Sequence, residues 1–216
     1  MALAHALAGL REVVDADRSM RNGSEQFLKQ EVRTLYGARV GIIGYGNLAQ
    51  SLHPLLAPFR CALQAYDPWL PGSYLVDRGV AAADLDTLLG SSDVIFVLAA
   101  PTPENRAMLS RDKLEKVKEG AVVVLVSRAH VVDFDALLDL AEEGKFTATI
   151  DVYPEEPPPA EHRVRRSVNT ILTPHLAGAS IHARRNIGRL LLKDIEAMNS
   201  GLPPMCMRIA QPGSKM

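Results

Sequence analysis

Three residues with different ionisable groups each follow an apolar stretch of the sequence: Arg128, Glu156 and His175. A guanidinium, a carboxylate and an imidazole are the groups that reduction of a 2-keto acid requires. The guanidinium binds the substrate carboxylate through two hydrogen bonds. The imidazolium donates a proton to the carbonyl oxygen as hydride arrives, and a carboxylate beside it orients the ring and favours its charged form. We therefore treat Arg128, Glu156 and His175 as candidate catalytic residues.

Each of the three also has a purely structural explanation. An arginine in a loop is usually a solvated or salt-bridged surface group, and Glu156 precedes Pro157 at a position that is commonly exposed. His175 follows Pro174 and could cap a helix. The catalytic interpretation depends on the fold bringing all three to one place.

A glycine-rich turn predicts where the hydride carrier binds. Gly44-x-Gly46-x-x-Ala49 follows the apolar run Val40–Ile43 and opens a helical segment. Gly44 permits a tight turn, Gly46 lets a pyrophosphate approach the backbone, and Ala49 allows close packing of helix on strand. The N-terminus of the helix then attracts the phosphates. The motif predicts a dinucleotide site.

Asp67 strengthens this prediction because it closes the next apolar run, Ala62–Tyr66, at the usual distance from the motif for the residue that binds the adenosine ribose. The alternative role is that of a turn residue before Pro68. A carboxylate at position 67 would repel a 2′-phosphate, so we expect NAD to be preferred over NADP.

Apolar runs and helical patterns alternate along the rest of the chain. Further strands are expected at 94–99, 121–126, 147–150 and 170–172, and helices at 84–89, 110–117 and 133–142. Nearly continuous apolar strands between helices indicate a mostly parallel, doubly wound α/β sheet of the Rossmann type. Ligands bind such sheets at the carboxyl ends of the strands, where the three candidate catalytic residues also lie.

Two helices receive more specific expectations. Leu3, Leu7, Leu10 and Val14 share one face of an N-terminal helix, and no earlier residue of the chain could cover that face. We expect this stripe to mediate self-association. Proline at positions 54 and 58 should break or bend the helix after the glycine turn near His53.

Composition excludes several other classes of protein. The chain has 216 residues, 47% of them hydrophobic, and a net charge of −1, so it shows no preference for nucleic acid. No apolar run is long enough to span a membrane, and the N-terminus lacks the basic region of a secretory signal. The two cysteines have no neighbours at metal-ligand spacing. We expect a cytoplasmic protein with no metal and no membrane or nucleic-acid partner.

Five segments together, in this order, resemble the D-isomer-specific 2-hydroxyacid dehydrogenases, which include phosphoglycerate dehydrogenases and glyoxylate/hydroxypyruvate reductases. The segments are Gly-Ile-Ile-Gly-Tyr-Gly-Asn-Leu-Ala, Tyr-Asp-Pro, Ser-Arg-Ala-His-Val-Val-Asp, Asp-Val-Tyr-Pro-Glu-Glu-Pro and Thr-Pro-His-Leu-Ala-Gly. The resemblance implies NAD as cofactor, a small 2-hydroxy or 2-keto acid as substrate, a homodimer, and a seventh short strand near Val80. It makes Arg128 the substrate-binding arginine, His175 the proton donor and Glu156 its partner.

The same resemblance adds cofactor residues. Asp151 would approach the nicotinamide amide, and five others fall where family members touch the cofactor: Asn47, Leu48, Pro101, Ser127 and Gly178. Ala129 departs from the family, which usually has glycine there.

The implied organisation is a hinge and dimerisation helix (1–23), an NAD-binding domain (24–178) and a returning helix with a tail (179–216). Most of the substrate domain that family members carry before this point is not part of the sequence. A non-catalytic NAD-binding module, such as a sensor or corepressor-like protein, is therefore the alternative to a dehydrogenase.

Overall fold

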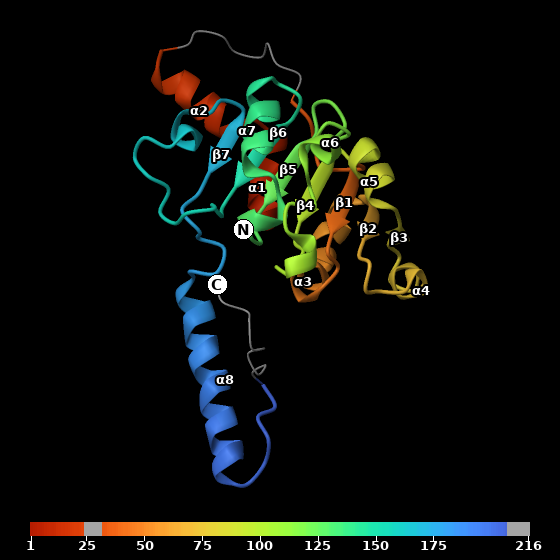
Figure 1. The fold of residues 1–216 in the computed structure, drawn as a ribbon, viewed down its shortest axis with the longest axis vertical. Coiled ribbons are helices and arrows are strands. Elements are labelled where there is room, and N and C mark those ends of the chain that lie inside the picture. Colours follow the sequence, from red (N-terminus) through yellow and green to blue (C-terminus); the bar gives the residue numbers. More distant parts are fainter. Residues whose placement is uncertain (24–31, 207–216) are drawn as a thin grey trace. The chain divides into compact units, whose positions relative to one another are not determined.

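A computed structural model describes residues 1–23 and 32–206 and divides the chain into two compact units, Met1–Pro174 and His175–Met216. The first unit contains a seven-stranded sheet in the order β3-β2-β1-β4-β5-β6-β7, and every neighbouring pair of strands is parallel (Figure 1). The predicted Rossmann-type sheet is confirmed. The chain adds β2 and β3 on one side of β1 and the later strands on the other, so the order reverses beside β1, where such sheets bind ligands.

The strands lie close to the predicted apolar runs. They are β1 (Arg39–Ile43), β2 (Ala62–Tyr66), β3 (Ala81–Ala82), β4 (Val94–Val97), β5 (Val122–Leu125), β6 (Thr147–Ile150) and β7 (Thr170–Leu172). The helices of the first unit are α1 (Ala2–Leu10), α2 (Val13–Arg21), α3 (Asn47–Leu56), α4 (Gly72–Val76), α5 (Leu85–Ser91), α6 (Arg111–Leu114) and α7 (Phe134–Glu142). Four short 3-10 helices complete it: η1 (Ala57–Phe59), η2 (Pro103–Asn105), η3 (Ala129–Val131) and η4 (Arg163–Arg166).

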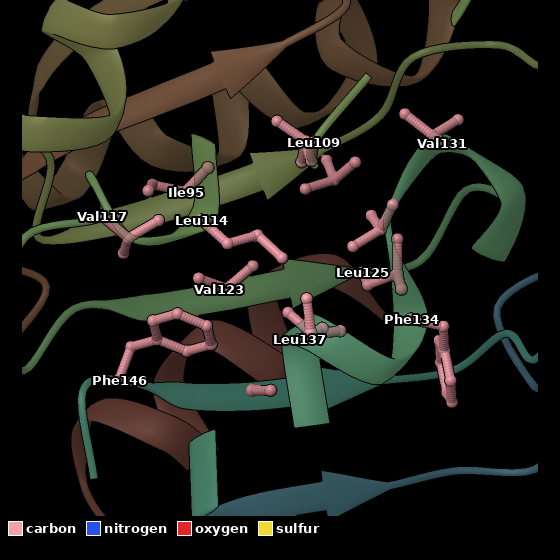
Figure 2. Packing of buried hydrophobic residues seen from close by; sticks show 14 of the residues in the cluster. Ile95, Leu109, Leu114, Val117, Val123, Leu125, Val131, Phe134, Leu137 and Phe146 are labelled. Carbon is pink, nitrogen blue, oxygen red and sulfur yellow. The ribbon is translucent and has the colours of Figure 1, made fainter. Parts of the chain in front are cut away.

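Alternate residues of the central strands belong to two separate apolar cores. Val123 and Leu125 of β5 belong to one core with Leu137 of α7, as Figure 2 shows. Val122 and Val124 of the same strand belong to the other core, which also contains residues of α1 and α3. Because successive side chains of a strand point to opposite faces, helices must cover the sheet on both sides.

The N-terminal helix differs from its prediction. Instead of one helix with an exposed stripe, α1 ends at Leu10, and α2 begins after Glu12, whose φ of 50° interrupts the helical path. Leu10 is only 2% exposed, because α1 packs on the sheet formed by later strands. A Cβ at Gly9 would lie 2.7 Å from Val122 Cγ1, which shows how closely the helix approaches β5. The expected exposed stripe is therefore wrong for α1.

The helix after the glycine turn does not break at His53. It runs through Pro54 to Leu56 and passes directly into η1. Pro54 lacks the N–H that would bond to the carbonyl of Gln50, but it lies only two residues before the helix end. Leu52 and Leu56 are buried in the core, and this packing holds the last turn in place.

The second unit consists mainly of α8 (Ile181–Asn199). Ser180 caps its start by accepting a hydrogen bond from the N–H of Ala183. Asp194 is 3% exposed and accepts the backbone N–H groups of Met205 and Cys206, each at 2.8 Å. This carboxylate fastens the segment that follows the helix. Across residues 1–23 and 32–206, no helix combines the length and the apolar character that crossing a membrane requires.

Candidate active site

The turn after β1 has the geometry that a dinucleotide motif requires. Gly44 has φ 86°, and its N–H donates to the carbonyl of Tyr66 at 2.9 Å, at the end of β2. A Cβ at this position would lie 2.5 Å from the Cα of Ala99, just beyond β4. Glycine is therefore required here both by the left-handed backbone and by the close approach of a neighbouring segment.

Gly46 has a different role. It is the N-cap of α3 with φ −80°, and a Cβ built on it would meet no atom within 4 Å. Asn47 and Leu48 are exposed around this open space, whereas Ala49 is fully buried beneath it. The predicted pyrophosphate position at the N-terminus of α3 requires such open space, and a side chain at position 46 would point into it.

Asp67 lies beside this turn. Its Oδ2 accepts the backbone N–H of Tyr45 at 2.8 Å and its Oδ1 accepts that of Trp69 at 3.0 Å. A carboxylate has about four acceptor sites, so both oxygens can also accept ribose hydroxyls. The ring of Tyr45 is buried, and its hydroxyl forms a 2.6 Å hydrogen bond with Nδ1 of His53 on α3. The structure thus brings the glycine turn and Asp67 together.

Ser127 and Arg128 follow β5 at the same edge of the sheet. Nη1 of Arg128 donates to the carbonyl of Ser127 at 2.8 Å, and the side chain is otherwise exposed. The hydroxyl of Ser127 is buried and has no hydrogen-bond partner among the residues that the structure describes. Buried hydroxyls are normally paired, so a cofactor contact would satisfy this one. Ala129 lies in η3 and has no positive φ, so the departure from glycine causes no strain.

Glu156 lies in the loop after β6. Its Oε1 accepts the backbone N–H of Tyr153 at 2.9 Å, and the residue is exposed. The hydroxyl of Tyr153 donates to the carbonyl of Thr173 at 2.9 Å. Burial, with a smaller contribution from the carboxylates of Asp151 and Glu156, raises the pKa of Tyr153 to about 12. Tyr153 therefore remains a protonated link between the loop that carries Glu156 and the end of β7.

Asp151 directly follows β6 and is fully buried. Oγ1 of Thr173 donates to its Oδ1, and the same Oγ1 lies 3.0 Å from Nε2 of His5 on α1. The sequence alone assigns no role to His5 or Thr173. The sequence signal is a histidine among the apolar residues Ala2 to Ala6, and the structure places it on the buried side of α1, which packs on the sheet.

The remaining candidates lie in loops. Pro101 is exposed in the segment after β4. His175 is the first residue of the second unit and has φ 52°, and Gly178 follows in the loop before α8. A pairing of His175 with Glu156 would join the two units and stays a prediction.

A parallel doubly wound sheet, a glycine turn at its switch point and an acid after the next strand define a dinucleotide-binding domain. Residues 3–177 match the family described as D-isomer specific 2-hydroxyacid dehydrogenase, NAD binding domain. The chain belongs to this family, and NAD is the cofactor of the domain.

Individual relatives agree with this assignment. The chain is 34% identical over 203 residues to D-3-phosphoglycerate dehydrogenase of Archaeoglobus fulgidus, covering 94% of this chain and 38% of that protein. It is 31% identical to hydroxypyruvate reductase of Thermotoga maritima, covering 90% of this chain and 64% of the relative. The crystal structure of a phosphoglycerate oxidoreductase from Rhizobium etli superposes with a TM-score of 0.87 at 39% identity, covering 99% of this chain and 66% of that one. The chain thus spans between about two fifths and two thirds of these relatives.

Proposed function

We propose that the protein is an NAD-dependent oxidoreductase that transfers hydride between NAD(H) and a small 2-hydroxy or 2-keto acid. One observation carries this proposal. The open glycine turn with Asp67 and the loops bearing Arg128 and Glu156 all follow strands of one parallel sheet, at its carboxyl edge. Cofactor-binding and substrate-handling groups would therefore meet at the same edge.

Several residues would hold the cofactor. Gly46 and the N-terminus of α3, with the flanking Asn47 and Leu48, would receive the pyrophosphate, and Asp67 would accept the ribose hydroxyls. Asp151 is proposed to approach the nicotinamide amide, and Pro101, Ser127 and Gly178 are proposed to contact the cofactor. The bound cofactor supplies or accepts the hydride.

The substrate would be handled by the three ionisable residues. Arg128 would bind the carboxylate of the keto acid through two hydrogen bonds. His175 would donate a proton to the carbonyl oxygen during reduction and take it back during oxidation. Glu156 would orient the imidazole and favour its charged form. The names of the relatives, phosphoglycerate dehydrogenase and hydroxypyruvate reductase, support a small 2-hydroxy acid as the substrate class.

A homodimer is proposed as well, on different grounds from those of the sequence. Several large apolar side chains of α8 are exposed, including Ile187, Leu191 and Leu192. Val13 and Met20 of α2 are also more than half exposed. Exposed apolar surface of this kind marks association sites, and analytical ultracentrifugation would measure the oligomeric state.

Turnover by the full chain tests the proposed activity. NADH oxidation should be measured with glyoxylate, hydroxypyruvate and pyruvate. The variant His175→Ala should lose about 10²–10⁴-fold in rate, the usual contribution of a positioned general acid, and should retain NADH affinity. His182→Ala, an exposed histidine in the same unit, is the matched control and should keep the parent rate.

NADH binding without turnover of any of the three acids would contradict the catalytic proposal. It would favour the non-catalytic NAD-binding module. A His175→Ala variant as active as the parent would remove the assignment of His175 alone.

A further inference from the structure

A chain of buried polar groups links α1 to the carboxyl ends of β6 and β7. Nε2 of His5 lies 3.0 Å from Oγ1 of Thr173, which in turn is hydrogen-bonded to Oδ1 of Asp151. His5 is 3% exposed and Asp151 is fully buried. His5 and Thr173 are 168 residues apart in sequence, so only the folded sheet brings them together.

The chemistry of the groups fixes the direction of these hydrogen bonds. An ionised carboxylate only accepts, and a threonine hydroxyl has a single hydrogen to donate. Thr173 must therefore donate to Asp151 and accept from the N–H of His5 at Nε2. Burial lowers the pKa of His5 although the charge of Asp151 raises it, so the imidazole is neutral at neutral pH. In that tautomer Nδ1 carries no hydrogen, so it cannot donate to the backbone carbonyl of Thr149 near the ring, and no hydrogen bond to Nδ1 forms within residues 1–23 and 32–206.

Such an arrangement is costly for a purely structural contact. His5 leaves one buried nitrogen unpaired, and a buried unpaired polar atom destabilises the folded state. Its neighbour Ala6 and, further along the helix, Leu10 are apolar core residues, and an apolar side chain at position 5 would avoid this cost. The chain of hydrogen bonds leads from His5 to the carboxylate of Asp151, at the edge of the sheet where the cofactor is proposed to bind, so a role for His5 in orienting that carboxylate would account for the cost.

We infer that His5 is a positioning residue for the nicotinamide group: it orients the hydroxyl of Thr173, which holds Asp151 as the acceptor for the carboxamide N–H. This inference rests on the proposed function, in which Asp151 faces the nicotinamide amide. A carboxylate accepts a hydrogen bond from the amide NH₂ and repels its C=O. A fixed Asp151 therefore selects one orientation of the nicotinamide ring.

The test compares two ligands that differ in the nicotinamide. NADH contains the carboxamide, and ADP-ribose lacks it while keeping the adenosine, the pyrophosphate and the second ribose. Thr173→Val removes the hydroxyl at nearly constant volume. We expect it to weaken NADH binding about 3- to 10-fold, the usual effect of losing one such hydrogen bond, and to leave ADP-ribose binding within about twofold of the parent. Isothermal titration calorimetry on the full chain measures both constants.

Two further comparisons separate positioning from stability. Thr149→Val is the matched control, because Thr149 is buried in β6 and its hydroxyl donates to the carbonyl of Val123, not to His5, Thr173 or Asp151. Thr149→Val should leave the ratio of NADH affinity to ADP-ribose affinity unchanged. His5→Leu should lower the ratio as Thr173→Val does, and His5→Gln, which places an N–H near the position of Nε2, should restore most of it. If Thr173→Val does not fold, the two His5 variants decide the question.

An unchanged ratio of affinities in Thr173→Val and His5→Leu would overturn the inference, even if both variants melt at lower temperature. The variant Asp151→Asn then shows whether the position proposed for Asp151 or the role proposed for His5 and Thr173 is wrong. If Asp151→Asn weakens NADH but not ADP-ribose, Asp151 faces the nicotinamide as proposed and only the role of His5 and Thr173 is wrong. If Asp151→Asn also leaves the ratio unchanged, the proposed site is wrong at Asp151 and the inference falls with it.

Discussion

The carboxylate of Asp67 accepts the backbone N–H of Tyr45 at 2.8 Å and thereby fastens the end of β2 to the glycine turn after β1. The residue proposed to bind the ribose thus also helps to shape the turn proposed to bind the pyrophosphate. Its second oxygen accepts the N–H of Trp69 at 3.0 Å, which fixes the orientation of the carboxylate before any ligand arrives. Such preorganisation lowers the entropic cost of binding.

Asp67→Ala should therefore reduce NADH affinity by about tenfold or more, since hydrogen bonds to a charged group contribute about 1.5–3 kcal/mol. NADPH affinity should rise, because the negative charge that repels a 2′-phosphate is gone. Fluorescence titration with both cofactors measures the change in preference. Asp77→Ala, which removes an exposed carboxylate after α4, should leave the preference unchanged. An Asp67→Ala variant with the preference of the parent would show that another residue selects the cofactor.

The two glycines of the turn should respond differently to substitution. At Gly44 a Cβ would meet backbone at 2.5 Å and φ is 86°, so Gly44→Ala should destabilise the fold by about 1–3 kcal/mol. At Gly46 a Cβ meets no atom and φ is negative, so Gly46→Val should fold and lose only about 1 kcal/mol, the usual effect of a poor N-cap residue. It should nevertheless lose NADH affinity, because its side chain would occupy the space proposed for the pyrophosphate. Thermal denaturation and cofactor titration separate the two effects, and tight NADH binding by Gly46→Val would refute the proposed position.

Much of the sheet and of the cofactor turn is predictable because the responsible signals are local. The run Val40–Ile43 followed by two glycines at fixed spacing specifies a strand and a turn without reference to the rest of the chain. Thr147–Ile150 and Thr170–Leu172 likewise coincide with β6 and β7.

The features that sequence reasoning missed depend on contacts between distant residues. The face of α1 needed a partner surface, which comes from strands more than a hundred residues later, such as β5 with Val122. No local pattern pairs His5 with Thr173. The continuation of α3 past Pro54 reflects core packing of Leu56, which outweighs the local preference of proline.

The packing of α1 on β5 yields a prediction about stability. Gly9→Ala would place a methyl group 2.7 Å from Val122 Cγ1, and overpacking of this kind costs about 1–3 kcal/mol. The change should lower the melting temperature although alanine favours helices. Gly188→Ala in α8 is the contrasting control: its Cβ would meet no atom, so helix propensity alone should stabilise α8 by about 1 kcal/mol. A Gly9→Ala variant at least as stable as the parent would indicate that α1 does not lie against β5.

The lowered pKa of His5 predicts how stability changes with pH. In the unfolded chain a histidine titrates near its ordinary pKa of about 6.5, whereas burial lowers the pKa of His5 in the folded chain. The charged groups that act on it are the carboxylate of Asp151, which raises the pKa, and the amino terminus, which lowers it. As pH falls below about 6.5 the unfolded chain binds a proton first, so stability is complete above that pH and is lost progressively below it. The loss from this residue ends once the pH has passed the lowered pKa of the folded state.

His5→Leu should remove this component, so the free energy of unfolding of the variant should fall less steeply than that of the parent as pH drops below about 6.5. His130 contributes in the same range, because burial, and to a smaller degree Arg106 and Arg128, lower its pKa. The effect of His5 is therefore the difference between the pH dependence of the unfolding free energy of the parent and that of His5→Leu. In His130→Gln the part of the pH dependence that comes from His5 should remain. Asp86 and Asp139 act at lower pH, because hydrogen bonds to neighbouring cations hold their pKa values below the ordinary range for aspartate. Urea denaturation at a series of pH values measures the difference, and parallel curves for parent and His5→Leu would show that His5 does not titrate differently in the folded chain.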